Sequence, residues 1–326
     1  MSETLPRRAI DWPHIVTTYG TAMGAVALIL FFSLAAENFI NPINLLNVLK
    51  QISYLAIIAI GFTLALMAGE LDLSIANVAS LASVATASLL FGGQPVWLGI
   101  AAGLAIALCL GLANGVLVTR FKVPSLIATL AVATIANGLS FLITEGVAYV
   151  GKLDPAFLFL GRGRLFDLPV LILWVVIIAG LALFFVKQTR AGVHLVASGE
   201  AEEAARLAGI ATRRMKVIGL TLSGLGAGIV GILLTSALSS SSPTIAGEFL
   251  MTGIAAVLLG MTMIEPGKPN IPGTLIGTLT IGVLSNGLTL LGAEYYVQDI
   301  VLGVIILLSV SLSASQLRRA AFGVTS

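Results

Sequence analysis

The sequence predicts an all-α integral membrane protein with about ten transmembrane helices, folded as one domain over residues 1–326. Apolar residues make up 58% of the chain and charged residues only 10%, whereas soluble domains carry about 25% charged residues. The apolar residues fall in long runs, and only a helix or a closed barrel satisfies its own backbone hydrogen bonds within a bilayer. A barrel would show short segments of alternating polarity, which this sequence lacks, so we expect helices.

Ten stretches without a charged residue are the expected membrane spans. In order they cover residues 15–36, 51–69, 73–92, 96–119, 123–144, 168–186, 217–237, 249–264, 271–293 and 300–317. The first is too long for the core of a signal peptide, so we expect it to remain uncleaved. The eighth is short for a full span, and we expect it either to extend back through residues 242–247 or to be partly broken.

The distribution of Lys and Arg orients the spans, because cytoplasmic segments carry an excess of positive charge. With residues 1–14 in the cytoplasm, thirteen cations fall on the inside and four on the outside. The inside set is Arg7, Arg8, Arg120, Lys122, Lys187, Arg190, Arg206, Arg213, Arg214, Lys216, Lys268, Arg318 and Arg319. The outside set is Lys50, Lys152, Arg162 and Arg164, so the charge bias predicts that both termini are cytoplasmic.

The longest outer segment, residues 145–167, contains Lys152, Asp154, Arg162 and Arg164. This mixture of charges is compatible with an ordinary solvated loop. It is equally compatible with a docking surface for a soluble partner, because exposed mixed charge suits a transient polar interface. The sequence leaves both interpretations open.

The inner segment, residues 187–216, contains the pattern of a short capped helix over residues 199–209. Glu200, Glu202 and Glu203 stand at its start, Arg206 follows, and Gly209 lies just past its end. Glu202 and Arg206 are four residues apart and can pair. Alanines at helical spacing give a smooth face that a partner protein can approach closely. A helix on the membrane surface is the alternative, although three glutamates disfavour contact with anionic headgroups.

Residues 198–231 (SGEAEEAARLAGIATRRMKVIGLTLSGLGAGIVG) resemble the signature region of permease subunits of bacterial ABC importers of the ribose, xylose and galactose type. Residues 41–45 (NPINL), 68–74 (AGELDLS), 272–277 (PGTLIG) and 282–288 (GVLSNGL) also resemble that family, so the likeness covers nearly the whole chain. The sequence departs from the family at Glu70, where a glycine is usual, at residues 261–272 (MTMIEPGKPNIP), and after Glu248, where an acidic residue is missing.

The resemblance implies an inner-membrane permease that is not itself an enzyme and holds no cofactor. In that family the short helix is the coupling helix, which sits in a cleft of an ATPase subunit. The resemblance further implies two other partners besides lipid: a periplasmic substrate-binding protein and a second permease chain, identical or related.

Charge inside a span is costly, so acidic residues near the spans are candidates for the substrate path. Glu70 and Asp72 either line a broken helix or cap a turn at the inner membrane surface. Residues 68–71 (AGEL) recur as residues 246–249 (AGEF) at the opposite end of a span, which favours an inverted repeat of five-span halves. The candidate path residues are Glu70, Asp72, Asn77, Asn137, Glu248 and Asn286. So few fixed charges suit a neutral sugar or polyol.

The sequence contains no recognisable nucleotide or catalytic motif. It has no G-x-x-x-x-G-K-[ST] loop, and its two histidines, His14 and His194, lack metal-ligand spacing. The net charge of +2 gives no indication of a nucleic-acid partner. Three alternatives remain open: an ABC permease for nucleosides or branched-chain amino acids, a secondary transporter driven by an ion gradient, and a membrane protein without transport activity.

Overall fold

The computed structural model describes residues 12–322, and it describes the side chains of residues 22–309 and of Ser311. Within that range the chain is almost entirely helical. The long helices are α1 (Trp12–Ala35), α2 (Pro42–Met67), α3 (Ile75–Phe91), α4 (Val96–Thr119), α5 (Ser125–Thr144), α7 (Val170–Gln188), α10 (Thr212–Leu238), α11 (Phe249–Gly260), α12 (Ile271–Leu290) and α13 (Tyr295–Phe322). The short helices are α6 (Pro155–Arg162), α8 (Arg190–Glu200) and α9 (Glu202–Leu207).

Within residues 12–322, four two-residue strands lie in the connections between helices. Strand β1 (Tyr149–Val150) pairs antiparallel with β4 (Ser240–Ser241), and β2 (Arg164–Leu165) pairs antiparallel with β3 (Leu168–Pro169). The first pairing ties the segment after α5 to the end of α10. The second closes a small hairpin between α6 and α7.

Each of the ten predicted spans falls on one long helix, with boundaries moved by local chemistry. Helix α2 begins at Pro42, nine residues before its charge-free stretch, because the Asn41 side chain caps it by accepting a hydrogen bond from the Ile43 amide at 2.9 Å. Helix α5 begins at Ser125 because Pro124 takes an extended conformation before it. Helix α11 ends at Gly260, so the eighth span is short, as the sequence suggested.

Six of the described helices are long and apolar enough to cross a membrane: α2, α4, α5, α7, α10 and α12. Four shorter apolar helical stretches accompany them, at Ala22–Ala35, Ile75–Phe91, Phe249–Gly260 and Tyr295–Ser309. Helices α2 and α10 are the most enclosed of the six. Among the long helices, α3, α4, α7, α11 and α12 pack directly on one or both of these two.

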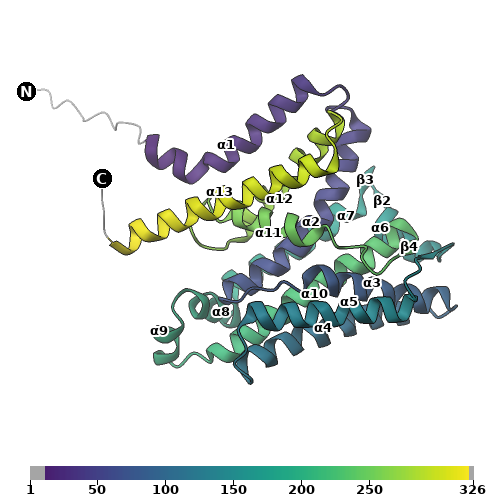
Figure 1. Cartoon of the computed structure of the whole chain (residues 1–326), viewed down its shortest axis with the longest axis horizontal. Helices are drawn as coiled ribbons and strands as arrows, with labels where there is room; N and C mark the ends of the chain where they lie inside the picture. The colour runs from purple at the N-terminus through teal and green to yellow at the C-terminus, as the bar shows by residue number, and fades with distance from the viewer. Residues whose placement is uncertain (1–11, 323–326) are drawn as a thin grey trace, which may run out of the picture.

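Helices α8 and α9 lie at one end of the molecule, and α6 and the strands lie at the other, with the long helices running between (Figure 1). The start of α1 and the end of α13 point toward the end that carries α9 (Figure 1). We call the α8–α9 end the inner end and the α6 end the outer end.

Small residues bring the central helices close together. A Cβ atom at Gly224 would meet the Ala107 carbonyl oxygen and Gly111 on α4, and a Cβ at Gly226 would meet Gly61 on α2. Helix α12 approaches α11 in the same way, because a Cβ at Gly277 would overlap the Ala256 carbonyl oxygen. These contacts show that the glycines allow close helix packing, as small residues do in membrane helices.

Candidate functional site

Helices α8 and α9 meet at Ala201, whose extended backbone (φ −151°, ψ 77°) interrupts the helix. Gly199 belongs to α8 and lies against the end of α2, where a Cβ atom would overlap the Met67 carbonyl oxygen. Gly209 follows α9 with φ +83°, and its amide bonds the Arg206 carbonyl at 3.0 Å. The predicted role of Gly209 in ending the helix is therefore confirmed.

The single helix predicted over residues 199–209 is wrong at its start. Gly199 and Glu200 close α8, and α9 contains only Glu202–Leu207. The reason is tertiary: α8 must keep Gly199 against α2, and the chain then turns at Ala201 to begin a new helix.

The predicted pair between Glu202 and Arg206 is also wrong. Arg206 pairs with Glu203 at 2.7 Å, and both side chains are largely exposed. The Glu202 carboxylate turns the other way and binds Lys216 at the start of α10.

Lys216 lies between two carboxylates. Its Nζ atom is 2.8 Å from Glu70 Oε1 and 2.9 Å from Glu202 Oε2. The side chain of Glu70 is 7% exposed, that of Lys216 18% and that of Glu202 50%. This ion triad therefore runs from the surface of α9 into the protein, and its two acids balance the half-buried cation.

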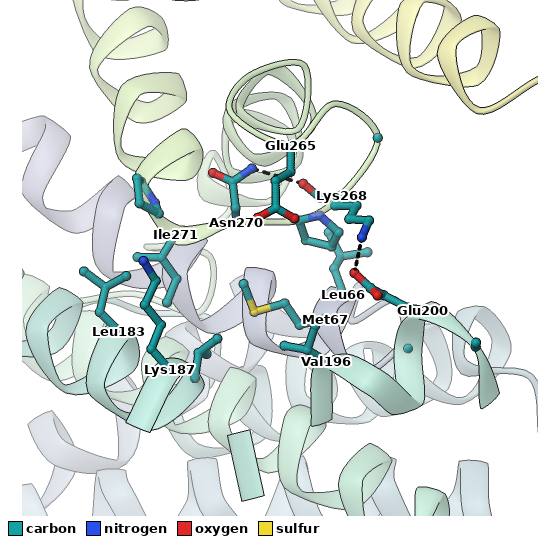
Figure 2. Close-up of a pocket in the computed structure, with 16 residues that line it drawn as sticks. Leu66, Met67, Leu183, Lys187, Val196, Glu200, Glu265, Lys268, Asn270 and Ile271 are labelled. Carbon is teal, nitrogen blue, oxygen red and sulfur yellow. Dashed lines mark hydrogen bonds and ion pairs between the residues drawn. The ribbon is translucent and has the colours of Figure 1, made fainter. Parts of the chain in front are cut away.

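A second ion pair ties α8 to the segment between α11 and α12. Lys268 Nζ lies 2.6 Å from Glu200 Oε1, and this hydrogen bond raises the pKa of Lys268 above its ordinary value. The pair stands at the edge of a cavity of about 530 Å³ that reaches Leu66 and Met67 at the end of α2 (Figure 2). The cavity separates α8 from the start of α12.

The surface of α9 that faces away from the protein combines charge with one large apolar side chain. Glu203 and Arg206 are exposed, and Leu207 is 83% exposed. Ala205 is buried, whereas Ala204 is exposed, so the predicted alanine face is divided between the protein and solvent. This arrangement leaves a small, protruding surface that suits contact with another protein.

Residues 68–74 form the connection between α2 and α3, which we call the inner turn. Asp72 is fully buried; its Oδ1 accepts hydrogen bonds from the Ser74 amide at 2.9 Å and the Ser74 hydroxyl at 2.5 Å. Asn114 on α4 donates to the Ser74 hydroxyl oxygen at 2.9 Å. Asp72 therefore organises the start of α3, and Glu70 in the same turn is held by Lys216.

A cavity of about 590 Å³ opens at the outer end, between the start of α2, the end of α6 and the start of α11. Its polar lining residues are Asn47, Lys50, Gln51, Tyr54, Arg162, Arg164 and Glu248. Burial raises the pKa of Glu248 above its ordinary value. Glu248 thus lines the same cavity as Arg162 and Arg164, the two arginines of the predicted docking loop.

The other candidate path residues do not gather in one place. Asn286 exchanges hydrogen bonds at 3.0 Å with Asn44 of α2, so its amide links two helices. Asn77 and Asn137 are half-buried on α3 and α5. The six candidates therefore lie along the length of the molecule, from Glu70 at the inner end to Glu248 at the outer cavity.

The outer segment is more ordered than a solvated loop. Asp154 caps α6 by accepting a hydrogen bond from the Ala156 amide at 2.7 Å, and Arg162 Nε donates to the Ala237 carbonyl oxygen at 2.5 Å. Lys152 and Arg164 are exposed. Helix α6 thus presents a fixed charged surface beside the outer cavity.

Sequence reasoning did not identify Lys216 and Lys268 as site residues, because it used both only to predict which segments are cytoplasmic. The sequence does indicate that further cations lie nearby, because residues 200–203 contain three glutamates and Arg206 can pair with only one of them. Which cations meet them depends on the packing of α8 and α9 against α10 and α12.

Comparison with known proteins gives a consistent result. The family described as "Branched-chain amino acid transport system / permease component" matches residues 44–310. The ribose import permease protein RbsC of Bacillus subtilis is 35% identical over 94% of this chain and 95% of its own length. The Escherichia coli ribose import permease protein RbsC is 37% identical over 87% of this chain and 90% of its own.

The L-arabinose transport system permease protein AraH of Escherichia coli is 34% identical over 94% of this chain and 93% of its own length. These likenesses cover the inner helices, the inner turn and the outer cavity alike. The chain therefore belongs to the family of membrane permease components of bacterial transport systems, within which ribose and L-arabinose import permeases are its relatives.

Proposed function

We propose that the chain is the permease subunit of an ABC importer for a monosaccharide, with a pentose as the first candidate. The observation that carries this proposal is the 35% identity to a ribose import permease over 94% of the chain. A path with few fixed charges is consistent with a neutral solute. Polyols fit the same chemistry and remain within the proposal.

The proposed topology has ten membrane crossings in the bacterial inner membrane, with both termini in the cytoplasm. The thirteen-to-four distribution of cations supports it, as does the position of α8 and α9 at the end to which the start of α1 and the end of α13 point (Figure 1). Lys187, Lys216 and Lys268 all line cavities at this end.

An inverted repeat of five-span halves is part of the proposal. Helix α3 packs on α4 and α5, as α11 packs on α12 and α13. Helix α10 packs on α3 and α4, as α2 packs on α11 and α12. Helices α3 and α11 follow the matching segments AGEL and AGEF at opposite ends of the molecule, which is the pattern expected of inverted halves.

On the inner side we propose that α9 and its flanking residues contact the ATPase subunit. The contact residues are Glu200, Glu202, Glu203, Arg206 and Gly209. The protrusion of α9 at the inner end and its exposed Glu203, Arg206 and Leu207 support this role (Figure 1). ATP would be bound and hydrolysed by the partner.

On the outer side we propose that a periplasmic binding protein docks on Lys152, Asp154, Arg162 and Arg164 and releases its solute toward Glu248. The path would pass Asn286, Asn137 and Asn77 and reach Glu70 and Asp72. Asn137 lies on α5, on the same face as the exposed Leu130 two turns earlier. We propose that a second permease chain covers this face, because a polar amide is costly against lipid.

The test is uptake of radiolabelled ribose and L-arabinose into proteoliposomes that contain the permease, its ATPase subunit and its binding protein. ATP-driven uptake is expected, and it should persist with an uncoupler that dissipates ion gradients. Reversing both Glu202 and Glu203 to Lys should abolish co-purification of the ATPase and uptake together. Uptake that collapses with the uncoupler while ATP is maintained would point instead to an ion-coupled transporter.

The family description favours one competing substrate class, the branched-chain amino acids. Competition by leucine or by a nucleoside, with none by pentoses or hexoses, would overturn the sugar assignment. Such a result would leave the ATP-coupled permease assignment intact.

A further inference from the structure

We propose that the ion triad of Glu70, Lys216 and Glu202, together with the inner turn, transmits the movement of α9 to the membrane helix α5. Lys216 is then a positioning residue for coupling and not part of the ATPase contact. This inference rests on the proposed function, since it supposes that a partner moves α9. It adds the route by which that movement reaches the solute path.

The first step runs from α9 to the inner turn. The exposed fraction falls from 50% at Glu202 to 18% at Lys216 and 7% at Glu70, so the triad connects a surface carboxylate to a buried one. Lys216 and Glu70 are both largely shielded from solvent, so either charge would be unfavourable without its ionic partner. Separating them is therefore unfavourable, and they are expected to move as one unit.

Close backbone packing reinforces the same step. The inner turn lies between α8 and α10, because a Cβ atom at Gly69 would meet Gly199 Cα at 3.3 Å and one at Gly219 would meet Ala68 Cβ at 2.7 Å. Gly69 itself has φ +81°, a conformation that glycine adopts without strain. The turn therefore has no free space on these two sides and must follow α8 and α10.

The second step runs from the inner turn to α5. The Leu71 amide donates to the Ser125 hydroxyl oxygen at 3.3 Å, and the Leu73 amide donates to Thr129 Oγ1 at 3.1 Å. Both acceptors are in the first turns of α5, which also carries Asn137 of the proposed solute path. A shift of the turn is thus a shift of the inner end of α5.

The polar cluster beside the turn can support a second arrangement. Asn114 Oδ1 is buried and makes no hydrogen bond to another protein atom, and the buried Ser223 hydroxyl lies close to Asp72 Oδ2 without a well-aligned hydrogen bond. A buried polar group without a partner is unfavourable. A displaced turn therefore has acceptors and a hydroxyl donor with which to form new bonds, as a two-state element requires.

The test compares variants in proteoliposomes with the ATPase subunit and the binding protein, measuring both ATP hydrolysed and sugar imported. Lys216→Met is expected to keep the ATPase bound and hydrolysing while sugar imported per ATP falls by about tenfold, a typical coupling between sites. Lys216→Arg keeps the cation and should stay near the parent ratio. Glu70→Gln, an isosteric change, should lower the ratio like Lys216→Met and serves as the second variant if that one does not fold.

Lys122→Met is the matched control. Lys122 lines a second cavity at the inner end, of about 310 Å³, together with Lys216 and Glu70, and it forms no ion pair among the described residues. It should leave the ratio unchanged. An unchanged ratio in Lys216→Met and Glu70→Gln would overturn the transmission route. Loss of ATPase binding in either variant would also overturn it, because Lys216 or Glu70 would then belong to the ATPase contact itself. Absence of ATP-driven uptake by the parent protein is a separate outcome, which removes the proposed function and this inference with it.

Discussion

Gly199 shows at the scale of one residue how the inner end is held together. It lies in α8 with no room for a side chain, because a Cβ atom would overlap the Met67 carbonyl oxygen and approach the Gly69 amide. Both obstacles are backbone atoms, which cannot rotate away as a flexible side chain would. The contact therefore fixes α8 against the end of α2.

Replacing Gly199 with Ala is expected to destabilise the protein by about 1–3 kcal/mol, the usual effect of overpacking. The measurement is the thermal midpoint in detergent, followed by size-exclusion chromatography after heating. Gly180→Ala on α7 is the control, because no atom lies within 4 Å of its added Cβ. Equal midpoints for the two variants would contradict the close contact.

Glu248 allows a prediction about pH. Burial raises the pKa of its carboxyl above the ordinary 4.5, so the folded state binds this proton more tightly than the unfolded state. The stabilisation of the folded state by the protonated Glu248 carboxyl is present in full below the ordinary pKa, and it is lost as pH rises through the raised value. Ionised Glu248 therefore opposes folding at neutral pH.

The Glu248→Gln variant should consequently have the same thermal midpoint as the parent near pH 4. As pH rises toward 7, the midpoint of the variant should become higher than that of the parent. The measurement is a series of thermal midpoints for both proteins over that range. A gap that shrinks with rising pH would contradict the direction of the pKa shift.

Several residue roles could be predicted from the sequence, and their partners could not. Gly209 was predicted to end a helix because glycine adopts positive φ without strain, and this is a local property. The partners of Glu202 and Glu200 are Lys216 and Lys268, which are 14 and 68 residues away along the chain. Local spacing suggested Arg206 for Glu202, but tertiary packing placed another cation closer.

Among the elements, α6 is the one whose position bears most directly on a partner. The sequence placed charges in residues 145–167 but did not predict a helix there. Asp154 caps α6 and Arg162 ties it to the end of α10, so the exposed charges have fixed positions beside the outer cavity. A fixed, charged surface favours fast electrostatic association with a soluble partner.

Arg164→Glu is expected to weaken docking of the binding protein by about fivefold, which corresponds to about 1 kcal/mol for an exposed charge pair. The loss should lie mainly in the association rate and should diminish at high salt, because salt screens exposed charges. Biolayer interferometry with the permease in nanodiscs measures both effects. Lys122→Glu makes the same charge reversal at the inner end and should leave docking unchanged; an equal loss in that variant would contradict a local docking surface.

Long apolar elements were predictable because their signal is internal to each segment. A helix in a bilayer satisfies its own backbone hydrogen bonds, so about 20 apolar residues suffice to predict one. The break at Ala201 was not predictable, since it follows from the contact of Gly199 with α2. Helix α8 was not predicted either, because its residues form no long apolar run.

At the scale of the whole molecule, the proposed topology predicts which side of the membrane each end faces. Phe166, between β2 and β3, is 99% exposed, and Leu207 at the end of α9 is 83% exposed. After the native Cys109 is replaced by Ala, a single cysteine is placed at one of these two positions.

The Phe166→Cys variant should react with a membrane-impermeant maleimide from the periplasmic side of intact cells, and the Leu207→Cys variant only after the inner membrane is opened. The Cys109→Ala protein without either change reports the background. Labelling of both cysteines from the same side would contradict the proposed topology.

The sequence alone determined that this is a many-helix membrane protein, because hydrophobic length acts through each segment separately, and its charge bias predicts that most of the cations lie on one side of the membrane. It also carried the resemblance to sugar permeases. The tertiary structure decided which side chains meet: Lys216 with Glu70 and Glu202, and Lys268 with Glu200. Those contacts depend on how helices that are distant in the chain pack together. Glycines allow this close packing, but their positions in the sequence do not indicate which helix each one will contact.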